Sequence, residues 1–201
     1  MTTKFASKDR FGGDCIKRMA VQGAATHNHK IAIGHTRWAT HGDKTDVNAH
    51  PHLDHRSRIA VVHNGIIGNY HELKKEIKEQ YDIEPISGTD TEIVAILIGI
   101  ELDKNKSLFD AIKSGTERLE GAYSFVLISI LEPNNMYLFK NTGTMVIGVS
   151  DSLQEQLAQE MDLKTSPQQV QGNDEEEKKD GDEKDQTQHS FQIVASDTTV
   201  F

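Results

Sequence analysis

The sequence predicts an α+β domain, because its helical and strand-like stretches occur in separate blocks and not in strict alternation. The stretches with helical periodicity are residues 70–80, 91–102 and 108–119, and the strand-like runs that follow them are 122–130, 136–140 and 146–149. Separate blocks of this kind are typical of an antiparallel sheet, whereas a doubly wound parallel sheet alternates strands with helices. The length of 201 residues is sufficient for one sizeable hydrophobic core.

The three predicted helices differ in how their apolar side chains are distributed. In the first, Leu73 and Ile77 form an apolar i, i+4 pair and lysines occupy the other face, which predicts an amphipathic surface helix. The second is apolar nearly all round and is expected to be buried, with Asp90 in an N-cap-like position before it. Ser107 is the expected N-cap of the third helix.

Further strands are predicted outside the main block. The short runs 31–35 and 59–63 are rich in β-branched residues, and each ends at a polar motif. Pro-Asn-Asn at 133–135 predicts the turn of a hairpin between two of the later strands. Residues 191–195 return to strand composition after a long polar tract, so this tract is expected to interrupt the fold and not to end it.

The polar tract, residues 164–190, is almost free of apolar side chains and is predicted to be a disordered acidic insertion. Within it, residues 173–185 hold eight acids against three lysines, a charge of −5 out of the net −9 of the chain. An acidic interaction segment is the alternative interpretation. The expected organisation is a divergent N-terminal segment (1–29), a main domain (30–163), the insertion (164–190) and a return strand of the same domain (191–201).

Composition excludes several classes of protein. The longest apolar run, 93–100, has eight residues, far fewer than the roughly 20 of a membrane span, and the first ten residues lack the apolar core of a secretory signal. No cluster of Lys and Arg indicates a nucleic-acid surface. The single cysteine, Cys15, excludes an intramolecular disulfide framework. We therefore expect a cytoplasmic protein with no membrane partner, no nucleic-acid partner and no cofactor.

The densest polar segment, residues 34–42, follows the predicted strand 31–35. It contains Arg37, whose guanidinium can bind a carboxylate in bidentate fashion, and Trp38, which can form an apolar lid over a ligand. Thr40 and His41 lie in the same stretch. A surface loop with one buried tryptophan is an equally good interpretation of these residues alone.

Two further segments have both a chemical and a structural interpretation. Asn64 and Gly65 follow a predicted strand, where a side-chain amide and a backbone N–H can form an oxyanion hole, although Asn-Gly is also the commonest turn dipeptide. Asp90 can bind an ammonium group, or it can simply cap the helix that follows.

The histidines at positions 50, 52 and 55 are close in sequence and raise the possibility of a zinc site. Their spacing is not the i, i+4 spacing of a helical ligand pair, and no cysteine accompanies them. No metal site is therefore expected.

Taken together and in order, five motifs are more specific than any one of them. They are GHTRWATHG, NAHPH, HNGII with a following NY, GTDTE and LEGAY-F. Over residues 30–150, and again at 193–197, the chain resembles the glutaminase domain of the glutamine–fructose-6-phosphate aminotransferases. These are class II glutamine amidotransferases with the N-terminal-nucleophile (Ntn) αββα sandwich, so the resemblance implies a partial sandwich of this kind.

The resemblance also implies roles for individual residues. Arg37 matches the arginine that holds the α-carboxylate of glutamine, and Asp90 matches the acid that binds its α-amino group. Asn64 and Gly65 match the oxyanion-hole pair, while the role of His50, in the NAHP motif, stays open. The loop that folds over glutamine is matched by Trp38, Thr40 and His41.

The sequence departs from the family at the nucleophile, which in the family is a cysteine at the chain start with its own α-amino group as base. Here Thr2 and Thr3 follow the initiator Met, and the residues after Thr2 do not match the first strand of the family. Cys15 lies inside the chain, where its nitrogen is a peptide amide. We expect the chain as written to lack the nucleophile and the sugar-isomerase domains, as a piece cut at both ends.

Two functions are compatible with these observations. The first is the glutaminase part of an aminotransferase that passes ammonia from glutamine to fructose 6-phosphate and gives glucosamine 6-phosphate for the synthesis of UDP-N-acetylglucosamine. The second is a catalytically dead glutamine-binding or regulatory module. Under the first, L-glutamine is the ligand of this chain, fructose 6-phosphate is bound only by absent C-terminal domains, and the full-length form is a homo-oligomer. The piece alone is expected to be inactive.

Overall fold

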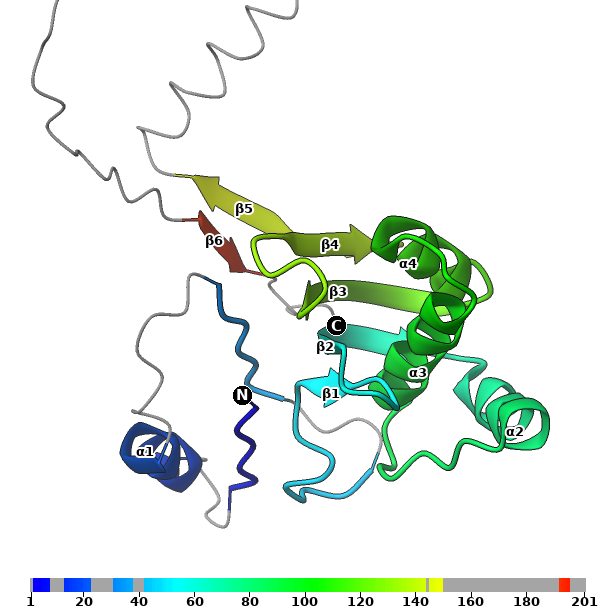
Figure 1. Ribbon diagram of the computed structural model, residues 1–201. Coiled ribbons are helices and arrows are strands. Elements are labelled where there is room, and N and C mark those ends of the chain that lie inside the picture. The colour runs from blue at the N-terminus through cyan, green and yellow to red at the C-terminus, as the bar shows by residue number, and fades with distance from the viewer. Residues whose placement is uncertain are drawn as a thin grey trace, which may run out of the picture. The chain divides into compact units, whose positions relative to one another are not determined.

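The computed structural model describes residues 2–7, 13–22, 31–37, 42–143, 145–149 and 192–195 (Figure 1). The chain divides into two compact units, Met1–Thr144 together with Asp197–Phe201, and Met145–Ser196. In the described part, the first unit holds the helices and a four-stranded antiparallel sheet, and the second holds a two-stranded antiparallel sheet. The expected α+β class is confirmed.

The four-stranded sheet has the order β1-β2-β3-β4, and every neighbouring pair is antiparallel. Its strands are β1 (His52–Leu53), β2 (Ile59–Ile67), β3 (Gly121–Ser129) and β4 (Met136–Lys140). β2 and β3 pair along their full length, in an unbroken register from Ile59 opposite Ser129 to Ile67 opposite Gly121. Alternate side chains of this pair, such as Val61 and Leu127, are fully buried because one face of the sheet packs against helices.

The helices are α1 (Gly13–Gln22), α2 (Tyr70–Tyr81), α3 (Asp90–Asp103) and α4 (Leu108–Thr116). α3 is the central helix: it contacts β1 and β2 on one side and α2 and α4 on others, so nearly every residue along it is buried (Figure 1). Gly115 allows α4 to pack closely on α3, since a Cβ there would lie 3.0 Å from the Ile98 Cα of α3. α3 therefore connects the sheet to the remaining helices.

Most of the predicted helices and turns are confirmed. The amphipathic helix is α2, with Leu73 and Ile77 buried, and the apolar stretch is the buried helix α3. Ser107 caps α4, where its Oγ accepts a hydrogen bond from the Asp110 N–H at 3.1 Å. The turn between β3 and β4 is closed by the Asn135 N–H, which donates to the Glu132 carbonyl at 3.0 Å.

Other predictions are wrong. The predicted strand 31–35 does not form, although exposed and partly buried residues alternate along this segment. A strand needs a hydrogen-bonded neighbour, and the ladders of the described sheets join other segments. α4 ends at Thr116 and not at residue 119, because the Thr116 hydroxyl bonds back to the Ile112 carbonyl at 2.8 Å and the Leu119 N–H closes a turn on the Thr116 carbonyl at 3.1 Å.

α1 and β1 were not predicted. α1 lies in a segment that has no match to the family motifs, and β1 has only two residues, too few for a recognisable alternating pattern. None of the helices in the described ranges is long and apolar enough to cross a membrane.

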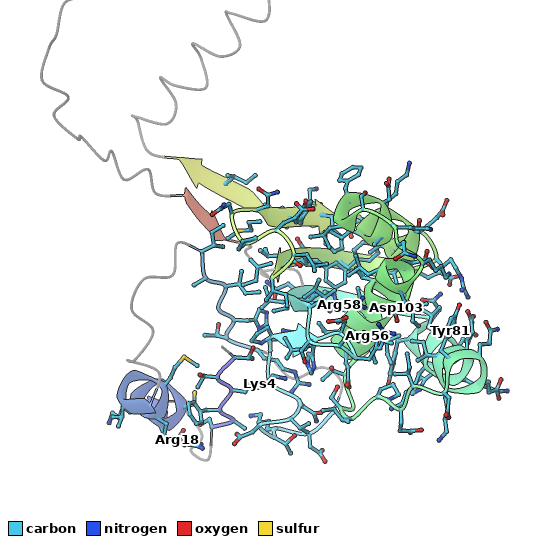
Figure 2. The ribbon with its side chains drawn as sticks, in the orientation of Figure 1. Lys4, Arg18, Arg56, Arg58, Tyr81 and Asp103 are labelled. Carbon is cyan, nitrogen blue, oxygen red and sulfur yellow. The ribbon has the colours of Figure 1, made fainter. Side chains whose placement is uncertain are left out.

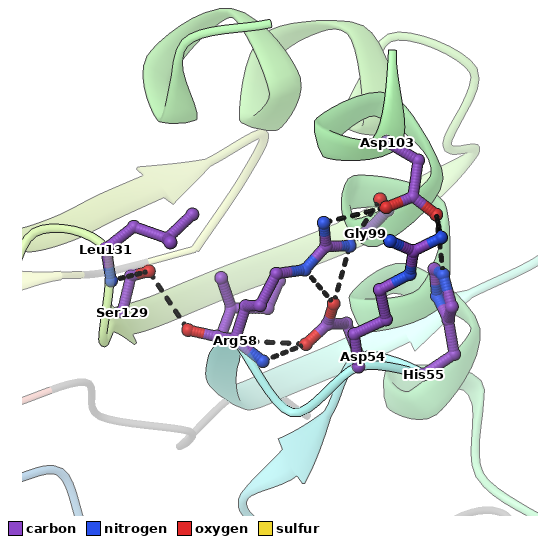
Figure 3. A network of polar contacts seen from close by, with 9 residues as sticks. Asp54, His55, Arg58, Gly99, Asp103, Ser129 and Leu131 are labelled. Carbon is purple, nitrogen blue, oxygen red and sulfur yellow. Dashed lines mark hydrogen bonds and ion pairs between the residues drawn. The ribbon is translucent and has the colours of Figure 1, made fainter. Parts of the chain in front are cut away.

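An ion network fastens the turn between β1 and β2 to the C-terminal half of α3 (Figure 3). The Arg58 guanidinium donates to the Asp54 carboxylate at 2.9 Å, to Asp103 at 2.7 Å and to the Gly99 carbonyl at 2.8 Å. The Asp54 side chain is completely buried, whereas the Arg56 side chain is 63% exposed. Arg56 also pairs with Asp103, and both residues are labelled in Figure 2. Arg58 therefore joins the turn to the helix through contacts with both Gly99 and Asp103.

The second unit contains β5 (Val146–Val149) and β6 (Gln192–Ala195), which pair antiparallel with Val146 opposite Ala195. The strands expected at 146–149 and 191–195 are thus confirmed. The acidic tract between them, 164–190, lies outside the described residues.

Candidate functional site

The site is built around the end of β2, where Asn64 and Gly65 are part of the strand and not of a turn. Gly65 has a φ of +128°, and a Cβ at this position would lie 2.1 Å from the Ala122 carbonyl oxygen of β3. Such contacts do not occur, so only glycine fits here. The turn interpretation of Asn-Gly is wrong because a partner strand far along the chain determines the local structure.

The register indicates where the backbone N–H of Gly65 points. Residues of an antiparallel strand alternate between bonding to one neighbour and to the other. At the end of the ladder the Gly68 N–H donates to the Glu120 carbonyl at 2.7 Å, so the odd-numbered residues of β2 face away from β3. The Ile67 N–H follows this rule and donates to the Asp90 carboxylate at 3.0 Å. By the same alternation, the Gly65 N–H points to the side of β2 where Asp90 lies.

Asp90 is the first residue of α3 and is 5% exposed. The N-cap of the helix is Thr89, so the capping interpretation of Asp90 is wrong. One oxygen of the Asp90 carboxylate accepts from Ile67, and the other lies 3.4 Å from the Thr91 hydroxyl and 3.7 Å from Nδ1 of His63. The carboxylate thus reaches from the start of a helix to the end of a strand.

Arg37 lies within electrostatic reach of Asp90. Burial lowers the pKa of the Arg37 guanidinium, and the negative charge of Asp90 opposes this shift. The guanidinium donates to two backbone carbonyls, those of Gly42 at 3.3 Å and Asp43 at 3.4 Å. The arginine is therefore held by its own loop, within the electrostatic influence of the carboxylate of α3.

One asparagine explains why Arg37 and Asp90 come together although they are far apart in sequence. The Asn48 amide donates to the Asp43 carbonyl and accepts from the Gly88 N–H, each at 2.9 Å. It thereby ties the backbone that holds Arg37 to a residue two positions before Asp90. Sequence analysis did not identify Asn48, although it belongs to the NAHPH motif.

A group of imidazoles surrounds the same region. Nε2 of His35 lies 2.7 Å from Oδ1 of Asn64, and Nδ1 of His50 lies 3.1 Å from Nδ1 of His35. Nε2 of His52 lies 3.0 Å from the hydroxyl of Thr89. Burial lowers the pKa of His52 to about 3 and lowers the pKa of His35 and His50 as well, so these three imidazoles are neutral at pH 7.

The zinc interpretation of the histidine-rich motif is not supported. His55 points elsewhere and pairs with Asp103 at 2.8 Å, at the far end of α3. In the part of the chain that the structure describes, no group of three or more His, Cys, Asp or Glu side chains is arranged to hold a metal ion.

The structure thus brings Arg37, Asn64, Gly65 and Asp90 to one end of β2 and α3. Trp38, Thr40 and His41, the other residues expected at the site, lie outside the described residues. The arrangement places a cation and an anion near each other, next to an amide side chain and a backbone N–H. A zwitterionic amino acid with a carbonyl group in its side chain has the complementary set of charges and acceptors.

Comparison with known proteins agrees with this chemistry. The family described as the glutamine amidotransferase domain matches residues 17–135. The chain is 44% identical over 122 residues to a glutamine–fructose-6-phosphate aminotransferase [isomerizing] of Aquifex aeolicus, covering 61% of this chain and 20% of that protein. It is 39% identical over 141 residues to the protein of the same name from Aeropyrum pernix, covering 70% of this chain and 22% of that protein.

Among solved structures, the chain is similar to glutamine phosphoribosylpyrophosphate amidotransferase from B. subtilis, at 28% identity and a TM-score of 0.45, over 57% of this chain and 24% of that one. The chain spans about a fifth of the length of the curated relatives it matches. The family match covers more than half of the chain and includes Arg37, Asn64, Gly65 and Asp90. The chain therefore belongs to the glutamine amidotransferase domain family.

Proposed function

We propose that this chain forms the glutamine-binding part of a glutamine–fructose-6-phosphate aminotransferase. Arg37 binds the α-carboxylate of L-glutamine, Asp90 binds its α-ammonium group, and Trp38, Thr40 and His41 close over the bound amino acid. The observation that carries the proposal is the position of Asp90, which bonds to the end of β2 at Ile67 and acts on the charge of Arg37. A single carboxylate thus both bonds to the strand that holds Asn64 and Gly65 and acts electrostatically on the arginine.

The chemical role of Asn64 and Gly65 concerns the amide end of glutamine. When a nucleophile attacks the amide carbon, the electron pair of the C=O π bond moves onto the oxygen, which takes up a negative charge; the C–N bond breaks when this tetrahedral intermediate collapses and the C=O bond re-forms. The Asn64 side-chain N–H and the Gly65 backbone N–H donate to this oxygen, and such donors contribute most when charge develops. The amide nitrogen leaves as ammonia after it gains a proton, and hydrolysis of the acyl intermediate releases glutamate.

Calorimetric titration of the chain with glutamine tests the proposed site. L-glutamine should bind in a 1:1 complex, and D-glutamine should bind much more weakly. Arg37→Gln removes charge-assisted hydrogen bonds of about 1.5–3 kcal/mol, which predicts a loss of affinity of about tenfold or more. Arg56→Gln is the matched control, because Arg56 lies at the other end of α3 beside Asp103. Equal effects of the two substitutions, or no binding by the unmodified chain, would contradict the proposal.

For the whole protein, we propose transfer of the amide nitrogen of glutamine to fructose 6-phosphate, with glucosamine 6-phosphate as the product. The similarity to the aminotransferases of Aquifex aeolicus and Aeropyrum pernix supports this assignment. Incubation of the full-length protein with amide-¹⁵N glutamine and fructose 6-phosphate should place the label in glucosamine 6-phosphate. Label that stays in free ammonia, in the presence of fructose 6-phosphate, would contradict it.

A module that binds glutamine without hydrolysing it is the second candidate. Cys15 favours it, because this residue lies within α1 and its nitrogen is a peptide amide that cannot act as a base. Under this candidate, glutamine is recovered intact after prolonged incubation with the chain. Release of ammonia that Cys15→Ala abolishes would rule it out.

A further inference from the structure

Two histidines connect the interior of the site to Asn64. Nε2 of His35 lies 2.7 Å from Oδ1 of Asn64, and Nδ1 of His35 lies 3.1 Å from Nδ1 of His50. His50 is 9% exposed, its ring contacts that of His35 with centroids 4.3 Å apart, and it also touches the ring of His52. His50, His35 and Asn64 thus form a continuous chain of contacts, which begins at His50 of the NAHPH motif and ends at the side chain of Asn64.

The chemistry of each atom fixes the positions of the protons along this chain. An amide oxygen only accepts hydrogen bonds, so Nε2 of His35 must carry a hydrogen and donate to Asn64. A neutral imidazole has one N–H, so Nδ1 of His35 has none and accepts a hydrogen bond. The hydrogen between the two rings therefore belongs to Nδ1 of His50. Burial disfavours the charged form of both rings, so each ring is neutral and carries a single N–H.

The orientation of the Asn64 amide follows from this arrangement. The amide group is planar, and its oxygen and nitrogen lie on opposite branches from the same carbon. When Oδ1 accepts the hydrogen bond from His35, the NH₂ group must point to the opposite side of the amide, away from His35. In the flipped orientation the oxygen would take that place, and an oxygen there would repel the negative charge that develops on the substrate.

We propose that His35 and His50 are positioning residues that hold the side-chain amide of Asn64 with its NH₂ group toward the carbonyl oxygen of bound glutamine. The inference rests on the proposed function, because it assigns Asn64 to the amide end of the substrate. It gives a role to His50, and it extends the site from the four residues described above to a second layer of neutral imidazoles. His35 and His50 do not contact the substrate themselves; they act through Asn64.

The proton positions are tested in the unmodified chain without any ligand. Long-range ¹H–¹⁵N NMR spectra distinguish a protonated from an unprotonated imidazole nitrogen. At pH 7.5 His35 should be the Nε2–H form and His50 the Nδ1–H form. If His35 is instead the Nδ1–H form, its Nε2 accepts from the Asn64 NH₂ group, and the proposal is overturned.

A double-mutant cycle on L-glutamine affinity then tests the functional consequence. His35→Leu should weaken binding about fivefold, the equivalent of one neutral hydrogen bond. His35→Gln, whose side-chain N–H₂ can take the place of the Nε2–H donor, should restore affinity to within about twofold. Asn64→Ala alone and the double variant Asn64→Ala/His35→Leu should bind equally, because His35 has no amide left to orient.

The outcomes separate this inference from the proposed function. Additive losses in the double variant would show a purely structural role for His35 and would overturn the inference, provided that the single variants keep the wild-type NMR fingerprint. If His35→Leu loses the fingerprint, the inference is decided by the affinity of His35→Gln and by the proton positions in the unmodified chain. If the unmodified chain binds no glutamine, the proposed function fails, and the NMR measurement still decides whether His35 holds Asn64 in the stated orientation.

Discussion

Replacing Gly65 by alanine adds one methyl group where the backbone of β3 leaves no room for a Cβ. The new Cβ would lie 2.1 Å from the Ala122 carbonyl oxygen and 2.8 Å from the Tyr123 Cα, both of them backbone atoms that no rotamer change can move. Real Cβ contacts stay above 3.0 Å, so the strands would have to separate by 0.9 Å, the difference between 3.0 and 2.1 Å. The substitution thus disturbs the ladder that holds Asn64.

Two costs combine in this variant. Alanine at a φ of +128° is strained, which costs about 1–3 kcal/mol. Separation of the strands weakens one or two backbone hydrogen bonds, each with a net contribution of about 1 kcal/mol. We therefore expect Gly65→Ala to lower the free energy of unfolding by about 2–5 kcal/mol, a large part of the roughly 5–15 kcal/mol that is typical of a domain.

Urea unfolding followed by far-UV circular dichroism measures this loss as a lower midpoint at unchanged slope. Gly68→Ala is the matched control, since a Cβ there would meet only the Glu120 carbonyl at an ordinary 3.6 Å. The control should stay within about 0.5 kcal/mol of the unmodified chain. A Gly65→Ala variant as stable as the control would refute the account of the close approach between β2 and β3.

Two further changes test other parts of the structure. The fold keeps His35, His50 and His52 neutral, whereas the unfolded chain takes up protons below the ordinary histidine pKa of about 6.5. Stability should therefore be complete above this pH and fall as the pH decreases toward 3, and His52, whose folded pKa is about 3, should alone account for about 2 kcal/mol at pH 5; an unfolding free energy that is constant from pH 7 to 5 would contradict this. Arg58→Lys should cost about 2–4 kcal/mol in urea unfolding, because lysine cannot replace the three-way guanidinium contact. Arg56→Lys, at an exposed position, should cost less than about 0.5 kcal/mol, and similar losses for the two would show that the network does not fasten the turn.

The helices α2, α3 and α4 were predictable from the sequence because their patterns are local. Leu73 and Ile77 recur at helical spacing, and the apolar stretch of α3 has no polar face that could be exposed to water. The N-cap role of Ser107 is also a local property, since its hydroxyl bonds three residues along the chain. For these elements the tertiary structure agrees with the local preference.

The site was predictable only in part, because its geometry depends on contacts between distant segments. Asn-Gly at 64–65 is a strand and not a turn since β3, more than fifty residues later, pairs with it. Asp90 is of a residue type that often caps a helix, and it lies at a helix start, but its carboxylate bonds to the Ile67 N–H of β2. The contact of His35 with Asn64 joins residues 29 positions apart, which no local pattern reveals. The motifs predicted the chemistry of these residues, and the sheet determines their arrangement.

The most direct test of the proposed site combines one substitution with one change in the ligand. Asp90→Asn preserves the shape of the side chain and keeps an oxygen for the Ile67 N–H, but removes the negative charge. The ligand 4-carbamoylbutanoate is glutamine without its α-amino group. If Asp90 binds the ammonium group, only the unmodified chain with L-glutamine has both partners, and this pair should bind about tenfold or more tighter than the other three combinations, which should be similar to one another. If Asp90→Asn weakens the binding of both ligands by the same factor, Asp90 does not recognise the ammonium group and the assignment of the site is wrong.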